Sequence, residues 1–347
     1  MKLLNQIFLL FLIIFLHINN ILATPTHRIK IEKNEIKIGL ATGLGGLGDR
    51  AFNDMQYNGV IKASKKFNIP FEYNAPQHPK ESINVIENLI QSGCNVIFAG
   101  GGYHMKAPVN KLSKKYPNII FALLDDVALN HRKNVCSILF EQNEGAFLAG
   151  ILSAMHSETK NVGIILATEH KPLLDFELGF REGIKFVSKD VDVVKKVIGK
   201  IFQIENPYSS PKLAKKLAEK IIKEKQVDII FQVASASGIG VFKAAEENNI
   251  KAIGVDSDQD YLYKGTILTS VMKRLDRAIV LTIDKIIKGN LENRSYRLGL
   301  KEGGIELSPM KFTKNIIKTS TLNKIEQVKQ KIINREIIVP TVFTNEE

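Results

Sequence analysis

The stretch IKIGLATGLGGLGDRAFNDMQYNGVIKASKKF, residues 36–67, decides the fold class of this chain. It begins with a short apolar run, passes through a glycine-rich turn and continues into a segment with a helical pattern. A buried strand that leads directly into a helix is the repeating unit of parallel sheets. The stretch therefore predicts an α/β protein.

The same alternation continues along the chain in two series. In the first series, helical segments alternate with apolar runs at residues 70–73, 95–99, 119–124 and 134–140. After an apolar helix expected at 145–156, the second series has apolar runs at residues 161–166, 191–198, 227–233, 252–255 and 267–272. Continuous apolar strands between helices are typical of parallel sheets that are covered on both faces. We therefore expect two doubly wound parallel-sheet lobes joined by a hinge.

The two series also predict how the chain divides between the lobes. We assign residues 24–140, together with about 271–290, to lobe I. Residues 141–270, together with about 291–347, are assigned to lobe II. Sheets of this kind bind ligands beyond the carboxyl ends of their strands. A ligand held between two lobes can then be enclosed by hinge closure.

The first 23 residues have the layout of a secretory signal peptide. Lys2 is followed by an apolar run at 7–16, and the small residue Ala23 stands at the expected cleavage position. The run is well short of the ~20 residues that span a bilayer. We expect an exported protein that is periplasmic or associated with the cell envelope. The first cysteine is Cys94, so no lipid-attachment cysteine follows the signal.

The composition limits the kinds of partner. The chain has 48 Lys and Arg against 36 Asp and Glu, which gives a net charge of +12. Basic clusters interleaved with aromatic residues, which are typical of nucleic-acid binding, are missing from the sequence. We therefore expect no nucleic-acid partner, while weak attraction to anionic surfaces stays possible. The two cysteines, Cys94 and Cys136, are expected to be small buried apolar residues.

The glycine-rich loop at residues 43–48 allows two interpretations. Its sequence GLGGLG matches the G-x-G-x-x-G pattern that cradles dinucleotide phosphates between a strand and a helix. Asp49, at the start of the following helix, would repel a phosphate there. We therefore favour a plain ligand-binding loop, and a nucleotide-dependent oxidoreductase remains the weaker alternative.

Catalytic motifs do not appear in the sequence. It has no H-x-x-x-H pair, no G-x-S-x-G nucleophile elbow and no G-x-x-x-x-G-K-[ST] phosphate loop. His and Cys residues do not cluster at the spacings of metal ligands. These observations favour a binding protein over an enzyme, with no cofactor and no metal.

Four residues that come after predicted strands, in loops or at the start of the next helix, suit a flat polar ligand. Phe52 and Phe176 open corresponding helices of the two series, and an aromatic base stacks well between two rings. Asp125 and Asp256 each follow a strand, where a carboxylate can accept hydrogen bonds from ring N–H groups or a vicinal diol. Each residue also has a structural alternative, as a core phenylalanine or as a turn or capping carboxylate.

Six motifs are spread in order over nearly the whole of residues 36–290. They are GLGGLGDRAFN (43–53), EGAFLAG (144–150), DFELG (175–179), SGIGV (237–241), IGVDSDQD (253–260) and TSVMK (269–273). Together they resemble the basic membrane protein family, especially its spirochaete members. These are purine-nucleoside-receptor-like substrate-binding proteins of ABC transporters. The resemblance implies a type I periplasmic-binding-protein-like fold, a purine nucleoside (guanosine, adenosine or inosine) in the cleft, and a membrane permease as partner.

The resemblance also implies roles for residues on the base side of the site. Phe52 and Phe176 match the two rings that sandwich the base. Asn53 matches the polar residue after the first ring, and Asp125 matches a carboxylate that faces the base. The family commonly has Asp where this chain has Gly43. Losing a charged partner of a ring nitrogen would cost about 1.5–3 kcal/mol of binding free energy.

Three further residues match the sugar side of the family's site. Asp256 matches the carboxylate that holds the ribose hydroxyls, Lys273 matches the lysine beside the sugar, and Gly238 matches the glycine of a small-residue loop. Most members are lipoproteins, and the missing attachment cysteine is a second departure. The net charge of +12 and Gly43 favour the alternative function, a surface adhesin or polyanion-binding protein derived from such a receptor.

Overall fold

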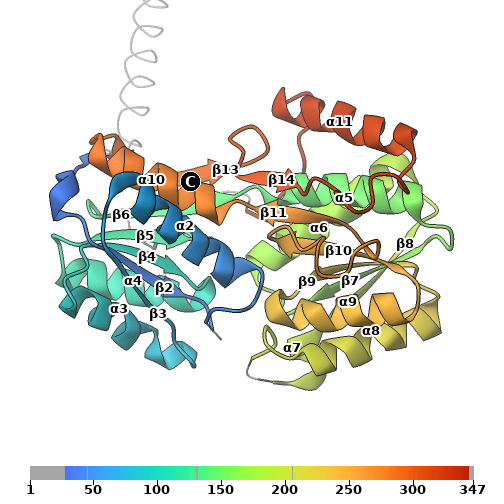
Figure 1. Cartoon of the computed structure of the whole chain (residues 1–347), viewed down its shortest axis with the longest axis horizontal. Coiled ribbons are helices and arrows are strands. Elements are labelled where there is room, and N and C mark those ends of the chain that lie inside the picture. The colour runs from blue at the N-terminus through green and yellow to red at the C-terminus, as the bar shows by residue number, and fades with distance from the viewer. Residues whose placement is uncertain (1–27, 45, 130–131, 205, 344–347) are drawn as a thin grey trace, which may run out of the picture.

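Two six-stranded sheets stand next to each other in the computed structural model of the chain (Figure 1). The structure describes residues 28–44, 46–129, 132–204 and 206–343, so the signal peptide expected at 1–23 lies outside the described residues. Helices cover both faces of each sheet (Figure 1). The predicted α/β class with two doubly wound lobes is confirmed.

The first sheet is parallel throughout. Its strand order is β13-β6-β5-β4-β2-β3. The strands are β2 (Ile38–Thr42), β3 (Phe71–Asn74), β4 (Val96–Gly100), β5 (Ile120–Leu124), β6 (Val135–Phe140) and β13 (Ser295–Leu298). Every residue of the four central strands is buried, because helices lie on both faces. This burial explains why their sequences are continuous apolar runs.

The second sheet repeats this design with one reversed edge strand. Its order is β14-β11-β10-β9-β7-β8, and only β14 runs antiparallel to its neighbour. The strands are β7 (Asn161–Leu166), β8 (Asp192–Val197), β9 (Ile229–Val233), β10 (Lys251–Asp256), β11 (Ile267–Lys273) and β14 (Ile305–Leu307). A separate short pair joins β1 (Arg28–Ile29) to β12 (Leu291–Glu292).

The helices divide between the two sheets as Figure 1 shows. Those of the first lobe are α2 (Phe52–Phe67), α3 (Ser82–Gln91), α4 (Tyr103–Lys115) and α10 (Leu275–Ile287). Those of the second lobe are α5 (Gln142–His156), α6 (Lys171–Val187), α7 (Ile198–Phe202), α8 (Pro211–Lys225), α9 (Gly238–Glu247) and α11 (Thr319–Ile333). The apolar helix expected at 145–156 is therefore α5, which begins three residues earlier.

Within the described residues, the chain passes between the lobes after β6, after β11 and after β13. The assignment of residues from about 291 onward to lobe II is wrong for β13, because this strand pairs with β6 in the first sheet. The assignment of 271–273 to lobe I is also wrong, because these residues end β11 in the second sheet. Strand β13 has only four residues, SYRL, and all are partly buried, so its sequence lacks the continuous apolar run that predicts a buried strand.

Both cysteines are buried and free, as the sequence predicts. Cys94 lies next to the first sheet, where its Sγ is 3.5 Å from the carbonyl oxygen of Ile38. Cys136 lies within β6. Burial raises the pKa of Cys94 to about 11 and that of Cys136 to about 12, so both remain as apolar thiols.

The strand orders place one switch point in each sheet. In the first sheet the order reverses between β2 and β4, and in the second sheet it reverses between β7 and β9. At a switch point, the loops after the two neighbouring strands separate and leave a crevice at their carboxyl ends. The two crevices identify where a ligand would bind.

Helices α5 and α6 cross so closely that glycine is required at the contact. A Cβ at Gly183 would lie 1.9 Å from the carbonyl oxygen of Phe147, and one at Gly150 would lie 2.2 Å from that of Phe180. These neighbours are backbone atoms of the facing helix, so they cannot move aside as a flexible side chain would. The crossing therefore fixes the position of α6, the helix that carries Phe176.

We expect Gly183→Ala to lower the free energy of unfolding by about 1–3 kcal/mol, because the added methyl forces the two helices apart. Urea unfolding measures this change. Lys185→Ala is the control, since Lys185 lies on the same helix with an exposed side chain that pairs with Glu182. Its loss should cost less than about 1 kcal/mol. Equal stability of Gly183→Ala and the native chain would contradict the packing described here.

Candidate functional site

A cavity of about 370 Å³ lies between the carboxyl ends of the two sheets. From the first sheet's lobe it is lined by the loops after β2, β4 and β5, and from the second by the loops after β7, β9 and β10. Six of the seven predicted site residues line it: Phe52, Asn53, Asp125, Phe176, Asp256 and Lys273. The cavity thus collects residues from both switch points, as parallel topology requires.

A buried ion pair links the two lobes inside the cavity. Asp125 follows β5 of the first sheet, and Lys273 ends β11 of the second. The Nζ of Lys273 donates to both carboxylate oxygens of Asp125, at 2.8 Å each. Burial raises the pKa of Asp125, and the Lys273 ammonium opposes that shift. With only 2% and 8% of the two side chains exposed, the pair is shielded from water and from salt.

Three aromatic rings surround the same ammonium group. The Nζ of Lys273 lies 5.7 Å from the ring centroid of Phe52, 5.6 Å from that of Phe140 and 5.1 Å from that of Phe176. Cations are attracted to the faces of aromatic rings at such distances. Phe52 from one lobe and Phe176 from the other therefore approach a common centre. The ring of Phe176 is otherwise packed edge-on against Phe231 at 6.0 Å.

Asp256 brings a buried carboxylate without a hydrogen-bond donor. It is the last residue of β10, lies in the left-handed backbone region with φ of 66°, and is 7% exposed. Among the described residues, none donates a hydrogen bond to its carboxylate. Burial raises the pKa of Asp256 to about 7, Lys273 opposes the shift, and the carboxylates of Asp49 and Asp125 add to it. Such a group favours a ligand that supplies hydroxyl or N–H donors.

Asn53 lines the cavity, but its side chain holds the glycine-rich loop. Its Oδ1 accepts the backbone N–H of Gly43 at 3.0 Å, and its Nδ2 donates to the carbonyl oxygen of Gly46 at 2.8 Å. Both polar atoms of the amide are thus engaged with the loop. Asn53 therefore holds in place the part of the cavity wall at Gly43, where no side chain is present.

The carboxylate of Asp49 binds the free backbone N–H groups at the start of α2. Asp49 accepts the backbone N–H groups of Ala51, Asn53 and Asp54 at distances between 2.8 and 3.1 Å. In a dinucleotide-binding loop, a phosphate would use these N–H groups. Since Asp49 occupies that position, the G-x-G-x-x-G match does not form a phosphate cradle.

The lobes touch on both sides of the cavity. On one side Ser235 donates its hydroxyl to Asp49 at 2.8 Å, and Ser257 donates to the carbonyl oxygen of Arg50 at 2.6 Å. On the other side the ring of Tyr103 stacks on that of His170 with centroids 4.0 Å apart. These contacts join the two lobes beside the cavity, which keeps an opening to solvent, so the structure is a closed arrangement of the lobes.

Gly238 does not reach the cavity, in contrast to the sequence-based assignment. It begins α9, and a Cβ there would lie 2.1 Å from the side-chain oxygen of Gln232. The glycine therefore makes room for Gln232 within the core. Ala234 and Ser235 of the same small-residue loop line the cavity instead.

Several lining residues were not singled out from the sequence. They are Tyr103, His104, His170, Tyr208 and Phe343. Tyr103 and His104 begin α4, and His170 directly precedes α6. All three come shortly after predicted strands, so their positions, although not their roles, could have been found. Phe343 lies far along the chain from every strand end that marks the site, and no sequence pattern indicates it.

The described part of the chain holds no group of three or more His, Cys, Asp or Glu side chains placed to bind a metal ion. Within residues 28–343, apart from the gaps given above, no helix combines the length and apolarity needed to cross a bilayer.

Comparison with known proteins identifies the family. Residues 38–342 match Bmp, described as ABC transporter substrate-binding protein PnrA-like. Basic membrane protein A2 of Borrelia garinii subsp. bavariensis is 30% identical over 304 residues, which is 85% of this chain and 86% of the relative. An uncharacterized lipoprotein of Pyrococcus abyssi is 27% identical over 285 residues, covering 80% of this chain and 70% of the relative.

A solved structure agrees with these relatives. The solute-binding protein of an ABC transporter system from Aeropyrum pernix K1 superposes with a TM-score of 0.77 at 25% identity, covering 88% of this chain and 94% of that one. The fold and the span of the family match agree with one another. This chain belongs to the Bmp family of PnrA-like substrate-binding proteins of ABC transporters, a non-enzymatic family.

Proposed function

We propose that this protein captures a purine nucleoside in the cavity between its lobes and delivers it to an ABC permease. The single observation that carries the proposal is the Asp256 carboxylate, which is buried at the cavity and accepts no hydrogen bond from the described residues. A vicinal diol supplies two hydroxyl donors to one carboxylate, so a ribose is the kind of group that would satisfy it.

The rest of the cavity suits the base of such a ligand. Phe52 and Phe176 come from opposite lobes and both line the cavity, so a flat ring between them would gain stacking contacts on both faces. A volume of about 370 Å³ is at the lower end of small-molecule sites, which favours a single nucleoside over a dinucleotide. Asp125 keeps unused lone pairs beyond its two bonds to Lys273 for a ring N–H donor.

The location of this activity is part of the proposal. The signal peptide expected at 1–23 and the relative named as a lipoprotein both favour work outside the cytoplasm. There the protein would close on its ligand by hinge motion and release it at the permease. It would be periplasmic or associated with the cell envelope.

Isothermal titration calorimetry with inosine, guanosine and adenosine tests the proposal. We expect binding of one ligand per chain for at least one of the three. For the ligand that binds, removing the diol, as in 2′,3′-dideoxyinosine for inosine, should weaken binding by more than about tenfold, because Asp256 loses both donors. The absence of heat with all three nucleosides at millimolar concentration would reject the proposal.

A further inference from the structure

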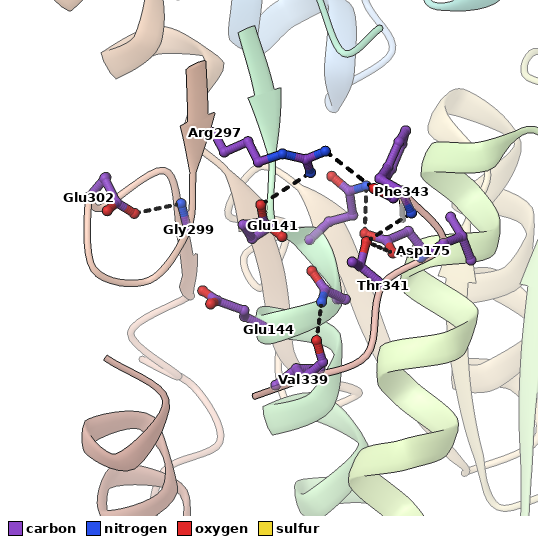
Figure 2. A network of polar contacts seen from close by, with 12 residues as sticks. Glu141, Glu144, Asp175, Arg297, Gly299, Glu302, Val339, Thr341 and Phe343 are labelled. Atoms are coloured by element: carbon purple, nitrogen blue, oxygen red, sulfur yellow. Dashed lines mark hydrogen bonds and ion pairs between the residues drawn. The ribbon is translucent and has the colours of Figure 1, made fainter. Parts of the chain in front are cut away.

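A segment distant in sequence from the lining loops closes the hinge side of the cavity. We name residues 339–343 the strap. Figure 2 shows it running past the start of α5 and past α6, beside the side chains of Glu141 and Arg297. Its last residue, Phe343, lines the cavity and is 6% exposed. The strap is thus part of the wall of the cavity.

The second lobe holds the strap through a buried carboxylate. Asp175 accepts the hydroxyl of Thr341 at 2.7 Å and the backbone N–H of Val342 at 2.9 Å (Figure 2). Its other oxygen accepts the side-chain amide of Gln142 at 2.9 Å. Asp175 has no exposed surface, so these three donors replace the water that the carboxylate loses. Asp175 also directly precedes Phe176, whose ring lines the same cavity.

The second lobe makes another contact with the strap at its beginning. The Nδ2 of Asn143 donates to the carbonyl oxygens of Val339 and Pro340, at 3.1 and 3.0 Å. Asn143 is itself buried near the start of α5, the helix that follows the first crossing between the lobes. The strap is therefore bound at both ends of its course over the second lobe.

The first lobe holds the other side of Phe343. The guanidinium of Arg297, on β13, lies 5.8 Å from the ring centroid of Phe343 and donates to its carbonyl oxygen at 3.4 Å. Glu141 pairs with the same guanidinium at 3.3 Å. Phe343 is thus held by Arg297 of one lobe while its neighbours Thr341 and Val342 are held by Asp175 of the other. Hinge opening would change the distance between these anchors.

From these contacts we infer that the strap belongs to the ligand site, with Phe343 as a specificity-determining wall and Asp175 as the positioning residue that sets both Phe343 and Phe176. This inference rests on the proposed function for the class of ligand. Because Arg297 holds Phe343 from the first lobe while Asp175 holds Thr341 and Val342 from the second, the strap has all of its anchors only when the lobes are closed. Ligand binding, which favours closure, therefore also favours the docked strap.

Phe343→Ala tests the wall. We expect the affinity for inosine, measured by calorimetry, to fall by at least tenfold, with Phe343→Leu recovering part of the loss. Ile338→Ala is the matched control, because Ile338 lies next to the strap with 74% of its surface exposed. Affinity of Phe343→Ala equal to that of the native chain would overturn the inference. Guanosine or adenosine replaces inosine if only one of those binds.

Hydrogen exchange of the native chain tests the strap without a variant. The amide of Val342 donates to Asp175 and that of Phe343 donates to the Thr341 hydroxyl, so both report docking. We expect their exchange to slow at least tenfold when the nucleoside is bound. Unchanged exchange would overturn the coupling even if Phe343→Ala fails to fold.

The two proposals fail separately. If none of the three nucleosides binds the native chain, the proposed function is wrong, and the strap is then tested by mass spectrometry of small molecules that co-purify. Retention by the native chain and loss from Phe343→Ala would support the strap inference. Equal retention by both would overturn it.

Discussion

Replacing Asp256 by asparagine is expected to weaken nucleoside binding by more than about tenfold and, at the same time, to stabilise the ligand-free protein at pH 8. Binding weakens because the ribose hydroxyls lose a charged acceptor. Stability rises because the variant no longer ionises a buried group that accepts no hydrogen bond from the described residues. The same carboxylate would thus be costly for folding and necessary for function.

The pH dependence of this effect follows from the sign of the shift. The pKa of Asp256 is raised to about 7 in the folded protein, against about 3.9 in an unfolded chain. The folded protein therefore binds this proton more tightly, and the group lowers stability as pH rises from about 4 through 7. At pH 8 the full cost is present, and Asp256→Asn should gain on the order of 2–4 kcal/mol. At pH 5 the gain should be much smaller.

Thermal unfolding at pH 5 and pH 8, together with calorimetry, measures both effects. Asp190→Asn is the control, because Asp190 lies in an exposed loop and its substitution should change neither stability nor binding. Unchanged nucleoside affinity of Asp256→Asn would remove Asp256 from the site. An equal gain at both pH values would show that ionisation is not the cause.

Breaking the pair between Asp125 and Lys273 should have the largest effect on stability. Lys273→Met removes the cation and leaves the Asp125 carboxylate buried without its partner. Loss of one member of a buried pair typically costs about 3–5 kcal/mol. The loss should be large here, because the Lys273 side chain is only 2% exposed and binds both oxygens of Asp125.

The double variant Lys273→Met/Asp125→Asn distinguishes the stranded charge from lost packing. It should recover more than half of the stability, since no uncompensated carboxylate remains. Lys288→Met is the control, because Lys288 makes an exposed pair with Asp284 that should be worth less than about 1 kcal/mol. Urea unfolding of the four chains gives the comparison. Lack of recovery in the double variant would contradict a charge-based role.

The lobes could be predicted from the sequence because their strands are buried on both faces. Such strands leave continuous apolar runs, and the runs at 36–41, 95–99 and 119–124 correspond to the central strands β2, β4 and β5. The strand β13 could not be found in this way. It is an edge strand of four partly buried residues, and its pairing with β6 depends on where the chain lies after the end of α10.

The candidate site was predictable wherever a residue follows a strand of a parallel sheet. Phe52, Asp125 and Asp256 were found for that reason, since strand ends converge whatever the loop sequence is. The prediction that Gly238 lines the cavity was wrong. The start of a helix has one side toward the cavity and one toward the core, and Gly238 faces Gln232 in the core. Sequence alone does not determine which side faces a cavity.

The sequence by itself determined the α/β class, the two lobes and the strand ends that face each other. Local apolar periodicity and strand order suffice for these features. Only the tertiary structure decided that Lys273 of one lobe neutralises Asp125 of the other, that Asp256 is left without a donor, and that Phe343 completes the wall. The pair of Lys273 and Asp125 joins residues 148 positions apart, and it exists only once closure of the two lobes brings them together.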